Sequence, residues 1–314
     1  MIKKEKTICV TMKLQTFEFR ADRFRRKYMK SEVIVMYPFK IGAIIDSFRR
    51  PFPEAMKIAH SLGIEGIQVY AVGGDMAPEN MTPDKQKAFL DLCAQNELKI
   101  SALCGDLGKG FTNPELNPML IERSKRIVDL AKKLGTNIVT THIGQVPEDD
   151  TCETYAIMQK ACLELAEYAD SMDAHFAIET GPEPAKRLCK FLDTLGSTGV
   201  SVNLDPANLV MCVDDDPAEA VRTLKRYIVH THAKDGISLV HSKEALNSEA
   251  AIQAAAGARW LELPLGQGGV NWNEYLAALD EIGYKGFLTI EREVGKDPVG
   301  DIGIAVNFLK DHIA

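Results

Sequence analysis

The sequence lacks a long apolar run, and this absence sets the first limit on what the chain can be. No stretch approaches 18 uninterrupted apolar residues, so the sequence predicts no membrane-spanning helix and no membrane partner. Aromatic residues make up only 7% of the chain, with two tryptophans. At 314 residues, with 46% hydrophobic and 26% charged, the composition is typical of a globular protein with a large core.

Paired cysteines are also missing. The seven cysteines are odd in number and scattered, and no two of them form a C-x-x-C pair. This pattern is typical of free thiols in a reducing compartment and favours a cytoplasmic location. No G-x-G-x-x-G motif follows the first predicted strand, so the usual sign of a dinucleotide-binding fold is absent.

The charge is unevenly distributed along the chain. The net charge of -7 argues against nucleic acid as a partner, because nucleic-acid binding usually needs a basic surface. Residues 1–30 nevertheless hold ten Lys/Arg against three acids. We interpret residues 1–36 as a basic N-terminal extension outside the fold. A targeting or nucleic-acid arm is the alternative, although the extension lacks the apolar core of a secretory signal.

The rest of the chain alternates short β-rich runs with amphipathic helical stretches. The predicted strands are 40–45, 66–70, 99–103, 137–141, 175–179, 200–205, 227–232 and 287–291. Strict alternation predicts a parallel sheet, and eight repeats favour a closed (β/α)₈ barrel over residues 37–314, with an open doubly wound sheet as the alternative. The 60-residue step from 227 to 287 predicts a long loop after the seventh strand.

Acidic and imidazole side chains end the last four predicted strands. The runs "HFAIET", "VSVNLD", "YIVHTH" and "FLTIER" carry Glu179, Asp205, His232 and Glu291. If these four side chains point into the barrel, the helix-facing positions of all four strands are mainly apolar, as the fold requires. Because catalytic groups of such barrels lie at the carboxyl ends of strands, we expect the four at one mouth.

Three carboxylates at one mouth repel one another unless a cation neutralises them. Three carboxylates and one imidazole suit Mn²⁺, Mg²⁺ or Co²⁺, and Zn²⁺ is possible. The residues therefore predict a site for one divalent metal ion. The alternative is structural: each acid caps the helix that follows it, and Asp205 in "DPAN" is the clearest case.

The motifs "FAIETG", "VNLDPANL", "VHTHAKD", "GQGGVNW" and "GFLTIERE" resemble the xylose isomerase-like barrel superfamily, from residue 40 to the C-terminus. That superfamily includes sugar phosphate isomerases and epimerases, ketose 3-epimerases and endonuclease IV. The resemblance implies that Glu179, Asp205, His232 and Glu291 bind the metal. It also implies that Glu179 and Glu291 are the catalytic acid/base pair, and that a homo-oligomer is possible.

The function expected on these grounds is that of a metal-dependent sugar isomerase or epimerase. It would abstract a proton next to a carbonyl of a sugar, sugar phosphate or cyclitol derivative. A lyase or dehydratase acting on keto-sugars or inososes is the alternative, followed by an endonuclease IV-like repair enzyme and by a binding module without metal. Ketose 3-epimerases carry a histidine and a glutamate where this chain has Asn208 and Ala185, so their substrate contacts are not reproduced.

Several further residues have expected roles near this site. The candidate substrate contacts are Gln68, His142, Asn208, Lys234 and Trp260. His142 is also a candidate general base, and Lys234 has an ion pair with a carboxylate as its alternative role. Asp235 is interpreted as the acceptor that orients the imidazole of His232. His230, one layer deeper in the strand, is interpreted as a hydrogen-bonded core residue, and Trp272 as a packing residue.

Overall fold

Eight parallel strands close into a barrel in the computed structural model, which describes residues 36–240 and 248–313. The strands are β1 (Lys40–Ile44), β2 (Gly66–Tyr70), β3 (Lys99–Cys104), β4 (Ile138–Thr141), β5 (His175–Glu179), β6 (Val200–Leu204), β7 (Ile228–Ala233) and β10 (Phe287–Ile290). Their order around the barrel is β1, β10, β7, β6, β5, β4, β3, β2. The predicted closed barrel is confirmed. Apart from Met36, the predicted basic extension lies outside the described residues.

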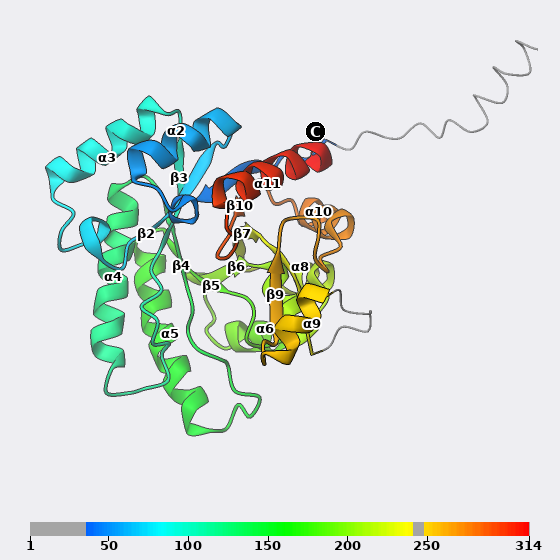
Figure 1. The fold of residues 1–314 in the computed structure, drawn as a ribbon. Helices are drawn as coiled ribbons and strands as arrows, with labels where there is room; N and C mark the ends of the chain where they lie inside the picture. Colours follow the sequence, from blue (N-terminus) through cyan, green and yellow to red (C-terminus); the bar gives the residue numbers. More distant parts are fainter. Residues whose placement is uncertain (1–35, 241–247, 314) are drawn as a thin grey trace, which may run out of the picture. The chain divides into compact units, whose positions relative to one another are not determined.

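Helices follow the strands and surround the barrel (Figure 1). The main ones are α2 (Phe52–Leu62), α3 (Pro83–Gln95), α4 (Asn117–Lys133), α5 (Glu153–Ser171), α6 (Ala185–Asp193), α8 (Pro217–Leu224), α10 (Trp272–Glu281) and α11 (Pro298–Ile313). Thr82, Asp216 and Asn271 cap α3, α8 and α10 by accepting hydrogen bonds from first-turn N–H groups. Within the described part of the chain, no helix combines the length and apolar character needed to cross a bilayer.

Alternation along the strands separates an apolar side from a polar side, as predicted. Phe176 and Ile178 on β5, with Val202 and Leu204 on β6, belong to the buried hydrophobic core between strands and helices. Side chains of the opposite parity face the barrel interior. Several are polar and fully buried, including Asn203 on β6. The interior beneath the mouth can therefore hold and orient polar groups.

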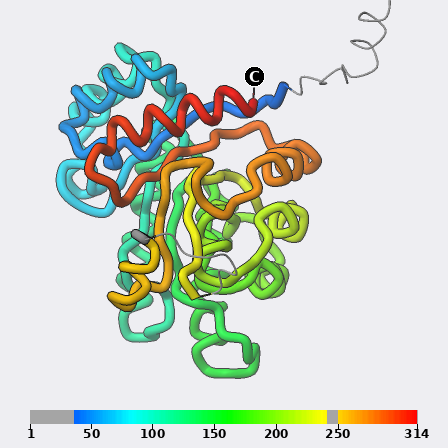
Figure 2. Tube along the Cα trace, turned by 45° about the vertical axis from the view of Figure 1, so that its right-hand side comes forward, coloured from blue at the N-terminus to red at the C-terminus, as the bar shows by residue number. Residues whose placement is uncertain are grey.

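The described residues between β7 and β10 include regular secondary structure where a long loop was predicted. It contains β8 (Asp235–Ser238) and β9 (Trp260–Leu263), which pair antiparallel as a separate two-stranded sheet. The helix α9 (Ser248–Ala255) precedes β9. Figure 2 shows β8 and β9 running side by side. We call this pair of strands the β8–β9 hairpin; its strand β9 forms part of the wall of the cavity at the barrel mouth.

Asp235, the first residue of β8, anchors the segment that leads into α10. Its carboxylate accepts hydrogen bonds from the backbone N–H groups of Gly236, Gly266 and Val270 and from Nε1 of Trp272. A Cβ on Gly268 would overlap this carboxylate, so the close approach requires glycine there. The predicted role of Asp235 in orienting His232 is therefore wrong, because both of its oxygens bind this segment instead.

Removal of the indole donor tests this anchor. We expect Trp272→Phe to lower the free energy of unfolding by about 1.5–3 kcal/mol, because a hydrogen bond to a buried carboxylate is lost. Trp260→Phe is the matched control, since Trp260 is half exposed, and we expect a change of less than about 0.5 kcal/mol. Urea unfolding followed by circular dichroism measures both. Equal effects of the two substitutions would contradict the anchoring role.

Candidate metal centre

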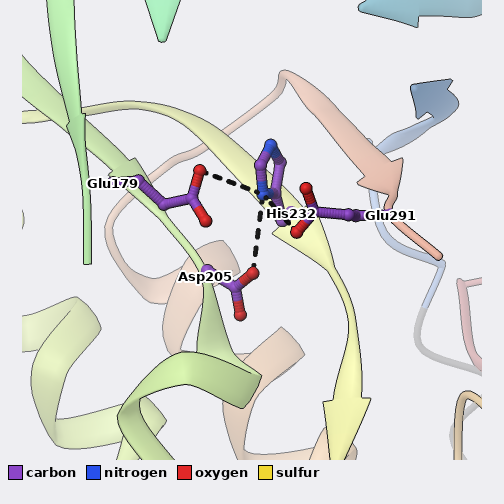
Figure 3. A group of neighbouring side chains, drawn as sticks. All are labelled: Glu179, Asp205, His232 and Glu291. Carbon is purple, nitrogen blue, oxygen red and sulfur yellow. Dashed lines mark ion pairs between the residues drawn. The ribbon is translucent and has the colours of Figure 1, made fainter. Parts of the chain in front are cut away.

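Four side chains from the carboxyl ends of β5, β6, β7 and β10 meet at one mouth of the barrel (Figure 3). Glu179 ends β5, Asp205 follows β6, His232 lies in β7 and Glu291 follows β10. One ligand atom of each residue lies within 4.8 Å of those of the other three, and all four residues are buried. The structure thus brings together the four residues that the strand-end pattern singled out.

The surroundings of Nδ1 of His232 fit a cation. This nitrogen lies 3.4 Å from Oε2 of Glu291, 3.5 Å from Oδ2 of Asp205 and 3.7 Å from Oε2 of Glu179. Within the described residues, His232 Nδ1 and Asp205 Oδ2 are buried without a hydrogen-bond partner. Two atoms bound to one ion at about 2.1 Å lie roughly 3–3.5 Å apart, close to these separations. The donor set therefore suits a hard or borderline divalent cation.

The charges of this site also favour a cation. Burial raises the pKa of Glu179 to about 7, because the site solvates its negative charge weakly. Burial acts in the same direction on Glu291, but the positive charges of His232 and Lys234 outweigh it and lower that pKa. Burial by itself lowers the pKa of His232, whereas Glu179 and Glu291 raise it well above its usual value. Without a metal, a protonated His232 imidazole provides the positive charge that stabilises the carboxylates. A bound cation would supply that charge instead.

The other ring nitrogen of His232 faces a carboxamide. His232 Nε2 lies 3.2 Å from Oε1 of Gln68, and His230 Nε2 lies 3.0 Å from the same oxygen. Because this oxygen only accepts hydrogen bonds, it favours a proton on Nε2 of His232 and leaves Nδ1 free to bind a metal. The amide nitrogen of Asn203 lies 3.1 Å from the same Nε2 and, as a donor, favours the opposite tautomer. Gln68 therefore has the role that was predicted for Asp235, as the acceptor beside the imidazole of His232. Its predicted contact with substrate stays a prediction.

His230 lies deeper in the barrel and is hydrogen bonded there, as expected. Its Nε2 also lies 3.0 Å from Oγ1 of Thr289. Burial and the neighbouring charge of His232 lower the pKa of His230 to about 3, so its ring is neutral at physiological pH. The two histidines of β7 therefore occupy different environments.

Loss of the carboxamide acceptor should weaken metal binding. We expect Gln68→Leu to reduce the affinity for Mn²⁺ by about 10–100-fold, the usual effect of removing the partner of a ligating histidine. Thr140→Val is the matched control, because Oγ1 of Thr140 accepts a hydrogen bond from the Gln68 amide nitrogen, and its loss leaves the Gln68 oxygen beside both histidines. Calorimetric titration of Mn²⁺ into metal-free protein measures the affinities. An unchanged affinity in Gln68→Leu would count against this role.

A histidine–aspartate pair stands beside the four residues. Nδ1 of His142 lies 3.0 Å from Oδ2 of Asp106, and its Nε2 lies 3.7 Å from Oε1 of Glu179. Burial by itself lowers the pKa of His142, but the hydrogen bond to Asp106 and the charge of Glu179 raise it to about 9. Asp106 was not predicted as a site residue. Its signal was an acid two residues beyond the end of β3, in "CGDLG".

Two other predicted contact residues hold the glutamates. Lys234 donates hydrogen bonds to Oε2 of Glu291, at 2.9 Å, and to Oε2 of Glu293. Asn208 donates from Nδ2 to Oε1 of Glu179 at 3.0 Å. Each member of the predicted acid/base pair is thus oriented by a hydrogen-bond donor, Glu179 by Asn208 and Glu291 by Lys234. The ion pair that was the alternative role of Lys234 is present, and substrate contacts of Lys234 and Asn208 stay predictions.

A cavity of about 1190 Å³ lies at this mouth, and Glu179 and Glu291 are part of its wall. The five predicted substrate-contact residues all line it: Gln68, His142, Asn208, Lys234 and Trp260. They come from well-separated parts of the chain, including the β8–β9 hairpin. The structure therefore brings every predicted site residue to one cavity or directly beneath it.

The sequence of this chain is similar to a protein-family model and to a known protein. The family model "Xylose isomerase-like TIM barrel" matches residues 56–312. The uncharacterized protein MJ1311 of Methanocaldococcus jannaschii is 25% identical over 247 residues, which are 73% of this chain and 76% of that protein.

Solved structures show the same fold. A xylose isomerase domain protein from Planctomyces limnophilus is 26% identical, with a TM-score of 0.69 over 88% of this chain and 96% of its own. The probable 3-DHS dehydratase AsbF of Bacillus anthracis is 20% identical, with a TM-score of 0.67 over 87% and 99%. A xylose isomerase-like protein from Mycobacterium smegmatis, in complex with magnesium, is 18% identical, with a TM-score of 0.65 over 88% and 98%. Epimerases are among the other similar structures.

Proposed function

Since the chain belongs to the xylose isomerase-like TIM barrel family, we propose that it is a divalent-metal-dependent sugar isomerase or epimerase. The observation that carries the proposal is the convergence of three carboxylates and one imidazole in a buried group at the barrel mouth. The proposed substrate is a sugar, sugar phosphate or cyclitol derivative with a carbonyl group. The similar fold of several epimerases supports this reaction class.

The metal would be held by Glu179, Asp205, His232 and Glu291, with Mn²⁺, Mg²⁺ or Co²⁺ favoured over Zn²⁺. When bound, the cation would neutralise the carboxylates and stabilise the negative charge that develops on the substrate oxygens. The magnesium complex of the mycobacterial protein is consistent with such a site. The hydrogen bond to Gln68 would favour the tautomer of His232 that presents Nδ1 to the metal.

Glu179 and Glu291 are the proposed acid/base pair. They approach His232 from opposite sides (Figure 3), and β7 and β6 separate their strands in the barrel. One carboxylate would take the proton from the carbon next to the carbonyl, and the other would deliver a proton to the opposite face or to the neighbouring atom. Asn208 and Lys234 would hold the two carboxyl groups in place during the transfer.

Exchange with solvent tests this proposal. Metal-free protein would be incubated in D₂O with ketoses, aldoses, their phosphates and inososes, with and without added Mn²⁺. We expect metal-dependent incorporation of deuterium at the carbon next to the carbonyl of at least one substrate, detected by NMR. If the metal-loaded protein exchanges no proton in any of these compounds, the isomerase or epimerase proposal is wrong.

A metal-dependent lyase or dehydratase is the second candidate, and the His142–Asp106 pair favours it. Elimination needs an acid for the departing hydroxyl group in addition to the base that takes the proton. His142 lies close to Glu179 and reaches the cavity, so it is placed to serve as that acid. The similarity in fold to a probable dehydratase is consistent with this reading. Mass analysis of products from keto-sugars and inososes distinguishes loss of water from isomerisation.

A further inference from the structure

The cavity at the barrel mouth extends well beyond the metal centre. We define its outer lobe by the lining residues Gln253, Trp260–Leu263, Arg292–Asp297 and Asp301. These residues belong to α9, to β9 and to the segment from the end of β10 into α11. The whole cavity, about 1190 Å³, exceeds the roughly 300–1,000 Å³ typical of small-molecule sites. A single hexose held between Glu179 and Glu291 would leave the outer lobe unfilled.

Large hydrophobic side chains are exposed on the wall of this cavity. Trp260 is 49% exposed and Val294 is 46% exposed, and both line the outer lobe. Tyr70, at the end of β2, is 37% exposed and lines the same cavity. By contrast, Trp272 is buried and hydrogen bonded to Asp235. An exposed indole in a cavity is a typical surface for an amphipathic partner, because it offers a flat apolar face beside polar groups.

The charges of the outer lobe disfavour an anionic ligand. Its acids are Glu262, Glu293, Asp297 and Asp301, and its bases are Arg292 and Lys296. Arg292 forms ion pairs with two of these acids, Glu262 and Asp301. Lys234, at the inner edge, is engaged by Glu291 and Glu293. A phosphate group would therefore meet an excess of negative charge with most cations already paired. A neutral group with many hydroxyls would meet no such repulsion, and carboxylate oxygens such as those of Asp297 can accept its hydrogen bonds.

We propose that the outer lobe binds a neutral glycosyl unit joined to the sugar that reacts at the metal centre, with Trp260 stacking on that unit. The substrate class is then a neutral oligosaccharide or glycoside rather than a sugar phosphate. This inference rests on the proposed function of the metal centre. Because proton abstraction needs a carbonyl, the glycosyl unit is attached through a hydroxyl group that leaves the carbonyl of the reacting sugar free.

Matched substrates test the proposal. Maltulose, lactulose and isomaltulose would be compared with fructose and fructose 6-phosphate, and maltose and cellobiose with glucose and glucose 6-phosphate. We expect at least one disaccharide to exceed its parent monosaccharide in kcat/KM for deuterium exchange by about tenfold, and the phosphates to show no gain. Trp260→Ala should reduce the disaccharide-to-monosaccharide ratio by about the same factor. Ile252→Ala is the control, because Ile252 is exposed on α9 outside the cavity wall and should leave the ratio unchanged.

Tryptophan emission gives a second readout that does not need turnover. The chain has only two tryptophans, and Trp272 is buried, so a change in emission on adding a disaccharide reports on Trp260. Disaccharide binding that calorimetric titration detects and that is lost in Trp260→Ala supports the outer lobe even if no exchange occurs, in which case only the proposed function fails. Exchange of the monosaccharides without a gain for any disaccharide, or a larger gain for a phosphate, overturns the glycosyl proposal alone. Neither exchange nor an emission change overturns both.

Discussion

Glu291→Gln is expected to lower the rate of metal-dependent deuterium exchange by at least about 10²-fold, and Glu179→Gln to do the same. A positioned carboxylate contributes roughly 10²–10⁴-fold to a proton transfer, and an amide neither takes nor delivers that proton. Both glutamates are buried, line the cavity and are oriented by donors, so each is placed to transfer a proton. Rates are measured by NMR in D₂O, at metal concentrations that saturate each variant.

The control for this prediction is Glu274→Gln. Glu274 is an exposed glutamate on α10 and belongs neither to the cavity wall nor to the four-residue group. We expect exchange within a few-fold of the parent protein in this variant. Metal content is determined in parallel, because Glu179 and Glu291 are also proposed ligands. Exchange that survives in both Glu179→Gln and Glu291→Gln would rule out the two-carboxylate mechanism.

His232→Ala is expected to abolish stable metal binding, whereas His230→Ala should retain it. His232 presents Nδ1 to all three carboxylates, so its loss should exceed the roughly 10–100-fold effect of removing a supporting residue. His230 contacts Gln68 and Thr289 instead and contacts none of the carboxylates through a hydrogen bond. Its replacement leaves a cavity and unpaired polar groups, which should lower the free energy of unfolding by about 2–4 kcal/mol.

Metal analysis after dialysis against Mn²⁺ and urea unfolding separate these outcomes. The expected pattern is a folded His232→Ala protein without metal and a destabilised His230→Ala protein with metal. The reverse pattern would show that the deeper histidine is the ligand. Loss of metal from both variants, with His230→Ala still folded, would mean that the two imidazoles act together through Gln68.

The barrel was predictable because its signals are local. Hydrophobic periodicity of two and of about 3.6 residues alternates along the chain, and strand boundaries follow it closely. The hairpin of β8 and β9 was not predicted. Trp260 of β9 pairs with Ser238 of β8 across 22 residues of sequence. The strands are not joined by a two-residue turn, which is the sequence motif that predicts a hairpin.

The residues that support the site could not be predicted from local sequence patterns. Asp235 lies three positions from His232 and was expected to orient it, yet β8 turns its carboxylate toward Trp272 and the loop before α10. The position facing His232 is taken by Gln68, which lies on β2 at a sequence distance of 164 residues. Proximity along a strand says nothing of which side chain lies across the barrel from it.

The sequence by itself therefore determined the fold class and the four residues at the strand ends. Parallel strands of one barrel deliver their carboxyl ends to the same mouth, and side-chain parity selects which residues point inward. Only the tertiary structure decided that Gln68 faces both histidines, that Asp106 pairs with His142, and that the β8–β9 hairpin brings Trp260 to the cavity. These contacts join segments from different parts of the barrel, and their geometry is set by strand register and closure rather than by any local pattern.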